Sequence, residues 1–589
     1  MDRQVLTPGQ GIRRLSLHTW MVAALLLLAL IFSTYNLAYS PPPWFDEGWY
    51  LQVPRNLVLY GQYAPLSSEG FRNHDTVVGV SPLFYLPIAA IFRLLGVGLL
   101  QARAVIVFYF LATCLLVYAV AQRLYGSRVA VTALVLFIFA QPDDRFTSAL
   151  LMGRQVMAEV PALLFLMVGI YMWITSFEGG SPWFLVLSGL FFGFAMKTKA
   201  QFMIVLPPVL VGLGLIDRFY YRQHRYRRFV LPLGVGLASV ALQYVLLLML
   251  LGREDFVAYL TSLAAASGPQ VRLFFNGHAM ERALKMLLRS EISFFVIAGL
   301  AYGIFEANRS SETYCAAVGT SEARRRCSPG VDAGHKCSYN PLETARSLTT
   351  ATNAPHAVLL ARRMDRAAIL RCFPLLFVAV WLTWFIFASV GWARYTFAAF
   401  ALSYLFVAKL LDDTARSLNQ RLERAVPSLR SRAWLSTGRR IAFLLVVVLV
   451  LLGLAPGVRA IFSPPDRSAH QLAAYIDGRV DGDETIETWE WEIPFLTPGQ
   501  TYHHPPTELL NSVIAAVNLG TPYDPQTYDF QQYDPTYILV GPFASWTGLY
   551  PTEFVDQRCS RVISVGAYHL YKIAIEPPQS QADGTSNRD

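Results

Sequence analysis

Apolar segments, most of them close to 20 residues long, recur along the first 460 residues and alternate with polar loops. A helix of about 20 apolar residues can cross the hydrocarbon core of a bilayer, because it satisfies its own backbone hydrogen bonds there. The pattern therefore predicts eleven membrane-spanning helices. They cover approximately residues 20–39, 102–124, 129–140, 157–177, 183–196, 200–216, 229–251, 291–305, 373–390, 396–411 and 441–454.

The polar segments between these helices differ in character. Residues 81–96 predict a short re-entrant helix, and residues 46–59 predict a helix on the membrane surface that is broken near Pro54. Residues 252–290 have the mixed composition of an outer loop. Residues 306–371 form a polar, basic insert whose Ser/Thr/Ala/Arg-rich composition suggests partial disorder.

Composition supports a membrane protein. Hydrophobic residues make up 54% of the 589 residues and charged residues only 15%, whereas a soluble domain carries about 25% charged residues. So few charges cannot cover the surface of a soluble protein of this length. The sequence therefore predicts a polytopic α-helical membrane protein.

Basic residues predict the orientation. The net charge is +9, and Lys/Arg-rich loops of membrane proteins stay in the cytoplasm. Arginines precede the first helix and fill the loops 218–228 and 412–440, which all fall on one face. The N-terminus and the insert 306–371 are thus expected in the cytoplasm of a plasma (inner) membrane protein. The outer loop 40–81 and the C-terminus are expected on the extracytoplasmic side, and this distribution of charge does not suggest nucleic-acid binding.

The last part of the chain differs from the rest. Residues 461–589 carry 17 acidic and 6 basic residues, a net charge of −11. A helix at 468–478, a buried strand at 535–541 and a closing hairpin at 562–573 predict a small α/β domain. We expect a membrane domain at 1–460 and an extracytoplasmic domain at 461–589.

Ionisable residues are nearly absent from the middles of the predicted helices and gather at their outward-facing ends. Transporters need such groups along the transport path, so this layout favours a site at the outer membrane surface. A carboxylate there can accept a proton from a hydroxyl group, and cations can hold a departing phosphate. The candidates are Asp46, Glu47, Asp75, Asp143, Asp144, Arg154, Glu159, Lys197, Lys199 and Arg394.

Each candidate also has a purely structural explanation. Asp46 and Glu47 can be a solvated pair in a loop, since polar residues normally flank membrane helices. Asp143 and Asp144 can cap the turn between two helices. The cations Lys197, Lys199 and Arg394 can extend toward phospholipid headgroups. No single motif decides between these alternatives.

Several short motifs, taken in order, resemble those of a known family. They are Asp46-Glu47-Gly48-Trp49-Tyr50, Ser81-Pro82-Leu83-Phe84-Tyr85, Gly153-Arg154-Gln155 with Glu159-Val160-Pro161, Gly193-Phe194-Ala195 followed by Thr198-Lys199, and Arg394-Tyr395. The family is the GT-C fold glycosyltransferases that use polyprenyl-phosphate sugars, typified by protein O-mannosyltransferases and the aminoarabinose transferase of lipid A. The resemblance covers roughly residues 20–411, and Ser81 stands where the family has a histidine.

The resemblance implies a GT-C membrane domain of about 11–13 transmembrane helices and a role for each motif. It implies that Asp46 is the catalytic base and that Glu47 supports it. It implies that Asp143 or Asp144 provides a second acidic site, where a divalent cation (Mg²⁺ or Mn²⁺) is an option. Lys199 and Arg394 are expected to contact the lipid phosphate. The neighbouring residues of these motifs, Lys197, Tyr395 and Arg154, join the predicted phosphate site.

Three functions follow as hypotheses. The first is transfer of a sugar from a polyprenyl-phosphate carrier to a lipid, glycan or protein acceptor at the extracytoplasmic face. The second is an oligosaccharyltransferase or ligase that uses a diphosphate carrier and relies more on a metal. The third is a lipid or solute transporter, which the lack of charge in mid-helix disfavours. The motifs identify neither the sugar nor the acceptor.

Overall fold

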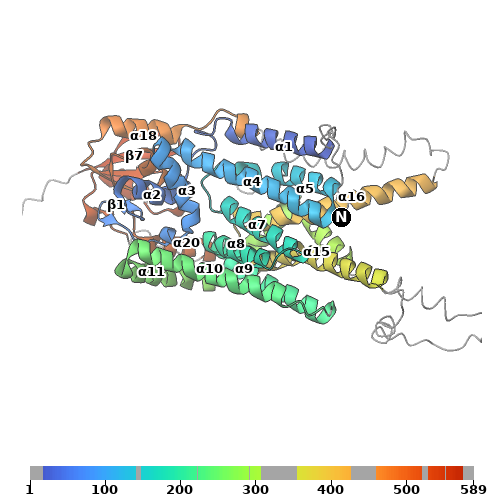
Figure 1. Ribbon diagram of the computed structural model, residues 1–589. Coiled ribbons are helices and arrows are strands. Elements are labelled where there is room, and N and C mark those ends of the chain that lie inside the picture. Colours follow the sequence, from blue (N-terminus) through green and yellow to red (C-terminus); the bar gives the residue numbers. More distant parts are fainter. Residues whose placement is uncertain are drawn as a thin grey trace, which may run out of the picture.

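The protein is described here by a computed structural model. The described residues are 17–140, 148–221, 223–290, 292–306, 355–425, 459–520, 528–550 and 552–574. Long helices run side by side through most of the molecule, and a small sheet lies at one end of them (Figure 1).

Seven helical segments in the described part of the chain are long and apolar enough to cross a membrane. They are Leu17–Thr34 (α1), Leu99–Tyr125 (α4), Glu159–Phe177 (α7), Ala200–Tyr220 (α9 with a terminal π-helical turn), Arg227–Leu251 (α10), Arg366–Ala388 (within α15) and Ala393–Leu418 (η3 with α16). An eighth is formed if Gly277–Arg289 (α12) and Ile292–Glu306, which meet at 90°, count as one broken span. Shorter apolar helices are α3 (Pro82–Leu95), α5 (Ser127–Phe139) and α8 (Trp183–Thr198). The protein is thus a multi-pass, mostly helical membrane protein.

The predicted helices from the first to the tenth each coincide with an observed helix, and the predicted re-entrant segment is α3. The eleventh, at 441–454, lies outside the described residues. The segment 252–290, predicted as an outer loop, folds into α11 (Arg253–Val271) and α12, and its side of the membrane stays a prediction. α15 (Pro355–Ala388) also begins inside the predicted insert, well before the expected start of that helix at residue 373.

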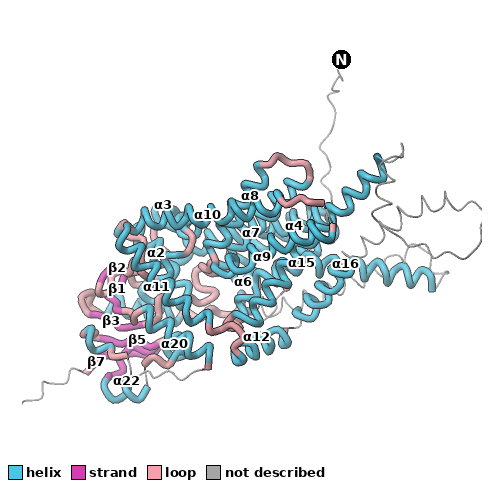
Figure 2. The backbone as a smooth tube through the Cα atoms, turned by 90° about the horizontal axis from the view of Figure 1, so that it is seen from below, coloured by secondary structure: helices cyan, strands magenta, loops and turns pink. Residues whose placement is uncertain are grey.

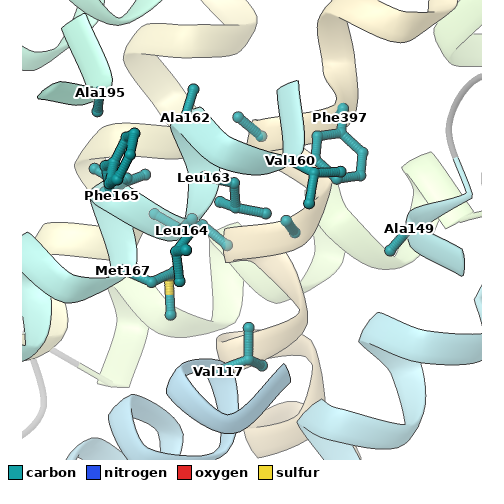
Figure 3. Packing of buried hydrophobic residues seen from close by; sticks show 14 of the residues in the cluster. Val117, Ala149, Val160, Ala162, Leu163, Leu164, Phe165, Met167, Ala195 and Phe397 are labelled. Carbon is teal, nitrogen blue, oxygen red and sulfur yellow. The ribbon is translucent and has the colours of Figure 1, made fainter. Parts of the chain in front are cut away.

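α7 forms the centre of the helix bundle. Apolar side chains surround it on nearly all sides, so α7 is buried rather than amphipathic. Leu163, Leu164 and Met167 of α7 lie among side chains from α4, α8 and α16, including Val117 and Phe397 (Figure 3). This packing holds the N-terminal end of α7, where Glu159 lies, in a fixed position.

The C-terminal sheet has five strands in the order β4-β3-β5-β7-β6. β4 (Thr501–His503), β3 (Thr485–Thr488) and β5 (Tyr537–Val540) are parallel, and β7 (Tyr568–Ile573) and β6 (Cys559–Val565) continue the sheet antiparallel. Helices accompany the strands: α18 (Ser468–Arg479), α19 (Glu492–Leu496), α20 (Thr507–Leu519), α21 (Pro542–Thr547) and α22 (Thr552–Arg558). The predicted helix, strand and hairpin of this region are confirmed, whereas the domain boundary at 460/461 stays a prediction.

α2 (Phe45–Tyr60) connects the sheet region to the membrane helices, beside α3 and the sheet (Figures 1 and 2). It is an unbroken helix that continues through Pro54, and residues 51–56 are buried. Arg55 donates a 2.6 Å hydrogen bond to the carbonyl oxygen of Pro494, and Gln52 contacts the carbonyl of Trp491. The predicted helix is confirmed, but it is not broken near Pro54 and does not lie open on a surface, because α19 and the segment before it cover α2 and tertiary hydrogen bonds hold its polar groups.

Candidate active site at the sheet end of the helices

The first turn of α2 carries Asp46, which forms an ion pair with Arg394. Arg394 belongs to the 3₁₀ turn η3 (Ala393–Thr396), just before α16. The side chains of Asp46 and Arg394 are only 14% and 12% exposed. The guanidinium group lies 5.6 Å from the ring centre of Trp44 and 4.9 Å from that of Trp392. In this partly desolvated setting a charge interaction is stronger than at an open surface.

A second ion pair lies against the next turn of α2. Nζ of Lys199, at the junction of α8 and α9, is 2.7 Å from Glu159 at the start of α7. Tyr50 lies one helical turn after Asp46 and next to Lys199, and Tyr395 is close to both. Burial raises the pKa of Tyr50, so its hydroxyl keeps its proton. Residues four apart share one face of a helix, and Asp46 and Tyr50 thus join the two ion pairs into one cluster.

Glu47 points elsewhere. Its two carboxylate oxygens accept hydrogen bonds of 2.9 and 2.6 Å from Nε and NH2 of Arg103, and the backbone N–H of Val156 adds a third at 2.9 Å. Both side chains of the ion pair are fully buried. Arg103 also donates to the carbonyl oxygen of Leu37. Three hydrogen bonds thus occupy the two carboxylate oxygens of Glu47. They hold the start of α2 against α4 and against the segment before α7.

The remaining predicted cations lie apart from the Asp46 pair. Lys197 Nζ lies 3.7 Å from the ring centre of Tyr244, in a cation–π contact. Arg154 is fully buried. Its guanidinium group donates to the carbonyl oxygens of Phe32, Tyr35 and Ser40. The contact of Lys197 and Arg154 with a lipid phosphate stays a prediction. The hydrogen bonds of Arg154 stabilise the C-terminal end of α1 and the segment after it.

The predicted second acidic site cannot be placed, because Asp143 and Asp144 lie outside the described residues. Within the described ranges, no group of three or more His, Cys, Asp or Glu side chains is arranged to hold a metal ion. Asp46 and Glu47 each already have an arginine partner.

Sequence reasoning missed Arg103, and it did not pair Glu159 with Lys199. Arg103 sits in the second turn of a long apolar helix, and a charge in such a place is costly without a partner. That signal pointed to a buried acidic partner, although it did not say which one. Tyr50 was part of the motif of residues 46–50 but received no role, since tyrosines are common near the ends of membrane helices.

Comparisons with known proteins bear on the fold and on the class of protein. Residues 79–247 match the family model described as dolichyl-phosphate-mannose-protein mannosyltransferase. An uncharacterized protein of Aquifex aeolicus is 25% identical over 193 residues, which are 33% of this chain and 37% of that relative. The chain thus matches little more than a third of the length of this relative.

Two solved structures have a similar fold. ArnT from Cupriavidus metallidurans bound to undecaprenyl phosphate superimposes with a TM-score of 0.55 at 13% identity, over 94% of this chain and 98% of ArnT. The apo oligosaccharyltransferase of Archaeoglobus fulgidus gives a TM-score of 0.50 at 12% identity, over 95% and 75%. The chain has the GT-C fold, and the family match agrees with the glycosyltransferase class that its motifs predict.

Proposed function

We propose that this protein is an integral membrane glycosyltransferase. It transfers a sugar from a polyprenyl-phosphate carrier to a lipid, glycan or protein acceptor at the extracytoplasmic face of the plasma (inner) membrane. The observation that carries the proposal is the cluster of Asp46, Arg394, Lys199, Glu159 and Tyr50 where the membrane helices meet the sheet. The cluster combines two carboxylates and two cations beside apolar helices, which suits a donor that is both a lipid and a phosphate ester.

In the proposed reaction, Asp46 accepts the proton of the acceptor hydroxyl group as its oxygen attacks the anomeric carbon. The bond between that carbon and the phosphate oxygen breaks, and its electron pair stays on the polyprenyl phosphate. Lys199 and Arg394 stabilise the added negative charge. Attack from the side opposite the leaving group inverts the anomeric centre.

Arg394 has a second part in this proposal. In the structure its guanidinium group is paired with Asp46, so an acceptor hydroxyl group has to compete with Arg394 for that carboxylate. Its Nε is buried and without a hydrogen-bond partner among the described residues. A donor phosphate gives Arg394 a competing anion, and its planar fork suits phosphate oxygens. Donor binding would thereby release Asp46 for proton transfer.

The fold shared with the Archaeoglobus fulgidus oligosaccharyltransferase supports one alternative, a carrier with a diphosphate instead of a monophosphate. The same cations would then hold a larger leaving group. Mass spectrometry of the released lipid separates the two, because a polyprenyl monophosphate and a polyprenyl diphosphate differ by one phosphate.

The proposal is tested with purified wild type and Asp46→Asn in nanodiscs, supplied with a panel of undecaprenyl-phosphate-linked hexoses and pentoses. Wild type is expected to release undecaprenyl phosphate from at least one donor in the presence of cell-envelope acceptors. Asp46→Asn is expected to lose this activity while keeping its thermal stability. Turnover at the wild-type rate by a folded Asp46→Asn protein would refute the role of Asp46 as the base.

A further inference from the structure

Four aromatic rings form a continuous chain of contacts beside the ion pair of Asp46 and Arg394, from the buried Phe45 to the exposed Trp546; we call it the aromatic wall. Its members are Phe45, Trp392, Phe543 and Trp546. Phe45 stacks on Phe543 with ring centres 3.7 Å apart, and Phe543 lies 5.7 Å from Trp546. Trp546 meets Trp392 edge to face at 6.0 Å. The wall thus joins α2, the loop before η3 and α21 of the sheet region.

The wall begins and ends at the candidate active site. Phe45 directly precedes Asp46, and the ring of Trp392 lies 4.9 Å from the guanidinium group of Arg394. Trp546, at the far side of the wall, is 48% exposed. A tryptophan this exposed forfeits much of the stabilisation that burial of its large ring would give. Its place in a chain of contacts to Asp46 suggests use in binding.

Charge limits what can bind there. The region that supplies Phe543 and Trp546, residues 461–589, carries a net charge of −11. Such a field disfavours an anionic acceptor, such as a phosphorylated glycolipid headgroup. The cations near the wall, Arg394 and Lys199, are already paired and are the ones proposed for the donor phosphate. A neutral ligand with a flat, weakly polar face fits the wall best.

We infer that the aromatic wall binds a sugar ring of a neutral carbohydrate acceptor, beside the hydroxyl group that Asp46 deprotonates. This inference rests on the proposed function and names its acceptor class. One face of a pyranose ring presents C–H groups with slight positive charge, and the face of an aromatic ring is negative. Trp392 and Trp546 meet edge to face and form a corner. A sugar ring in this corner can contact the face of one indole and the edge of the other. The acceptor thereby enters from the sheet side, away from the lipid tail of the donor.

The experiment measures acceptor binding without turnover. Full-length protein in neutral-lipid nanodiscs is mixed with methyl α-mannopyranoside, maltose or cellobiose, and saturation-transfer NMR reports contact. Trp546→Ala is compared with Trp546→Phe, which keeps an aromatic ring. The matched control is Trp183→Ala, because Trp183 is 71% exposed at the first residue of α8, away from the cluster. Thermal unfolding of each variant shows that it is folded.

Loss of one stacking ring is expected to weaken saccharide binding about tenfold in Trp546→Ala, with smaller effects in Trp546→Phe and none in Trp183→Ala. In turnover assays the KM for the acceptor rises while the KM for the donor stays unchanged. Equal binding by Trp546→Ala and Trp183→Ala would overturn the inference. So would Trp546-dependent binding of a serine/threonine peptide or of anionic phosphatidylglycerol vesicles in place of the saccharides.

Failure of the proposed function gives a different result. If Asp46→Asn retains turnover, the catalytic proposal falls, but the saccharide-binding data still decide the role of the aromatic wall. If saccharide binding does not depend on Trp546 while Asp46→Asn is inactive, only the acceptor inference falls. The two readouts, binding and turnover, are therefore independent.

Discussion

Replacing Glu47 by glutamine distinguishes the two neighbouring carboxylates of the α2 start. Glu47 and Arg103 are both fully buried, and two hydrogen bonds of 2.9 and 2.6 Å join them. A glutamine has nearly the same shape, but it leaves the charge of Arg103 buried without compensation. Breaking one partner of a buried ion pair costs about 3–5 kcal/mol. Glu47→Gln is therefore expected to lower the free energy of unfolding by about that amount.

The matched change is Asp46→Asn at the preceding position, which also removes one negative charge from the first turn of α2. The side chain of Asp46 is partly exposed, as is that of its partner Arg394, so water can solvate the guanidinium group that is left. Its expected cost in stability is smaller than that of Glu47→Gln, about 1–2 kcal/mol. Both variants are assayed for thermal unfolding and for release of polyprenyl phosphate. Glu47→Gln loses stability, and Asp46→Asn loses turnover.

A reversed outcome would refute the assignment. If Glu47→Gln has the stability of wild type but no activity, Glu47 takes part in catalysis. The ion pair of Glu47 and Arg103 then does not stabilise the fold. The double variant Glu47→Gln/Arg103→Met tests whether the uncompensated charge of Arg103 causes the loss of stability, because it removes both charges. It is expected to recover much of the stability that Glu47→Gln loses, since no uncompensated charge remains.

Three further changes test other parts of the structure. A methyl group at Gly48 would overlap the backbone of Trp491 and Glu492, so Gly48→Ala is expected to lower both the melting temperature and turnover, whereas unchanged values would contradict the close docking of α2. Burial raises the pKa of Glu490 to about 7, so the folded state binds its proton more tightly than the unfolded state. Stability is then expected to fall as pH rises from about 4.5 to 7, and Glu490→Gln should flatten this dependence in thermal unfolding at several pH values. Arg394→Lys loses the planar fork and is expected to raise the KM for the donor about tenfold; an unchanged KM would remove Arg394 from the phosphate site.

The sequence predicted the positions of the membrane helices well, because the burial of apolar residues in a bilayer depends on local composition and length. The helices at 102–124 and 229–251 agree with α4 and α10 within a few residues at each end. The helix α11 was missed, because its charged first turn and low overall hydrophobicity resemble a surface loop. It forms through contacts with α10 and α20, which no local pattern contains.

The partners within the candidate site could not be predicted from the sequence. Arg394 is almost 350 residues away from Asp46 along the chain, and only the packing of α16 against the rest of the bundle brings the two together. The same holds for Lys199 and Glu159, which come from different helices. The sequence showed that these charges lie at helix ends. The helix ends had to be arranged in space before the pairs could be named.

The order of the two carboxylates illustrates the limit most directly. In the sequence, Asp46 and Glu47 are equivalent neighbours, and both precede a helical segment. Successive residues of an α-helix point about 100° apart, because one turn takes 3.6 residues. One carboxylate therefore has to face away from the partner of the other. The phase of α2 turns Asp46 toward Arg394 and Glu47 toward Arg103, so the proposed division between a catalytic and a supporting carboxylate depends on how the helix docks rather than on which acid is present.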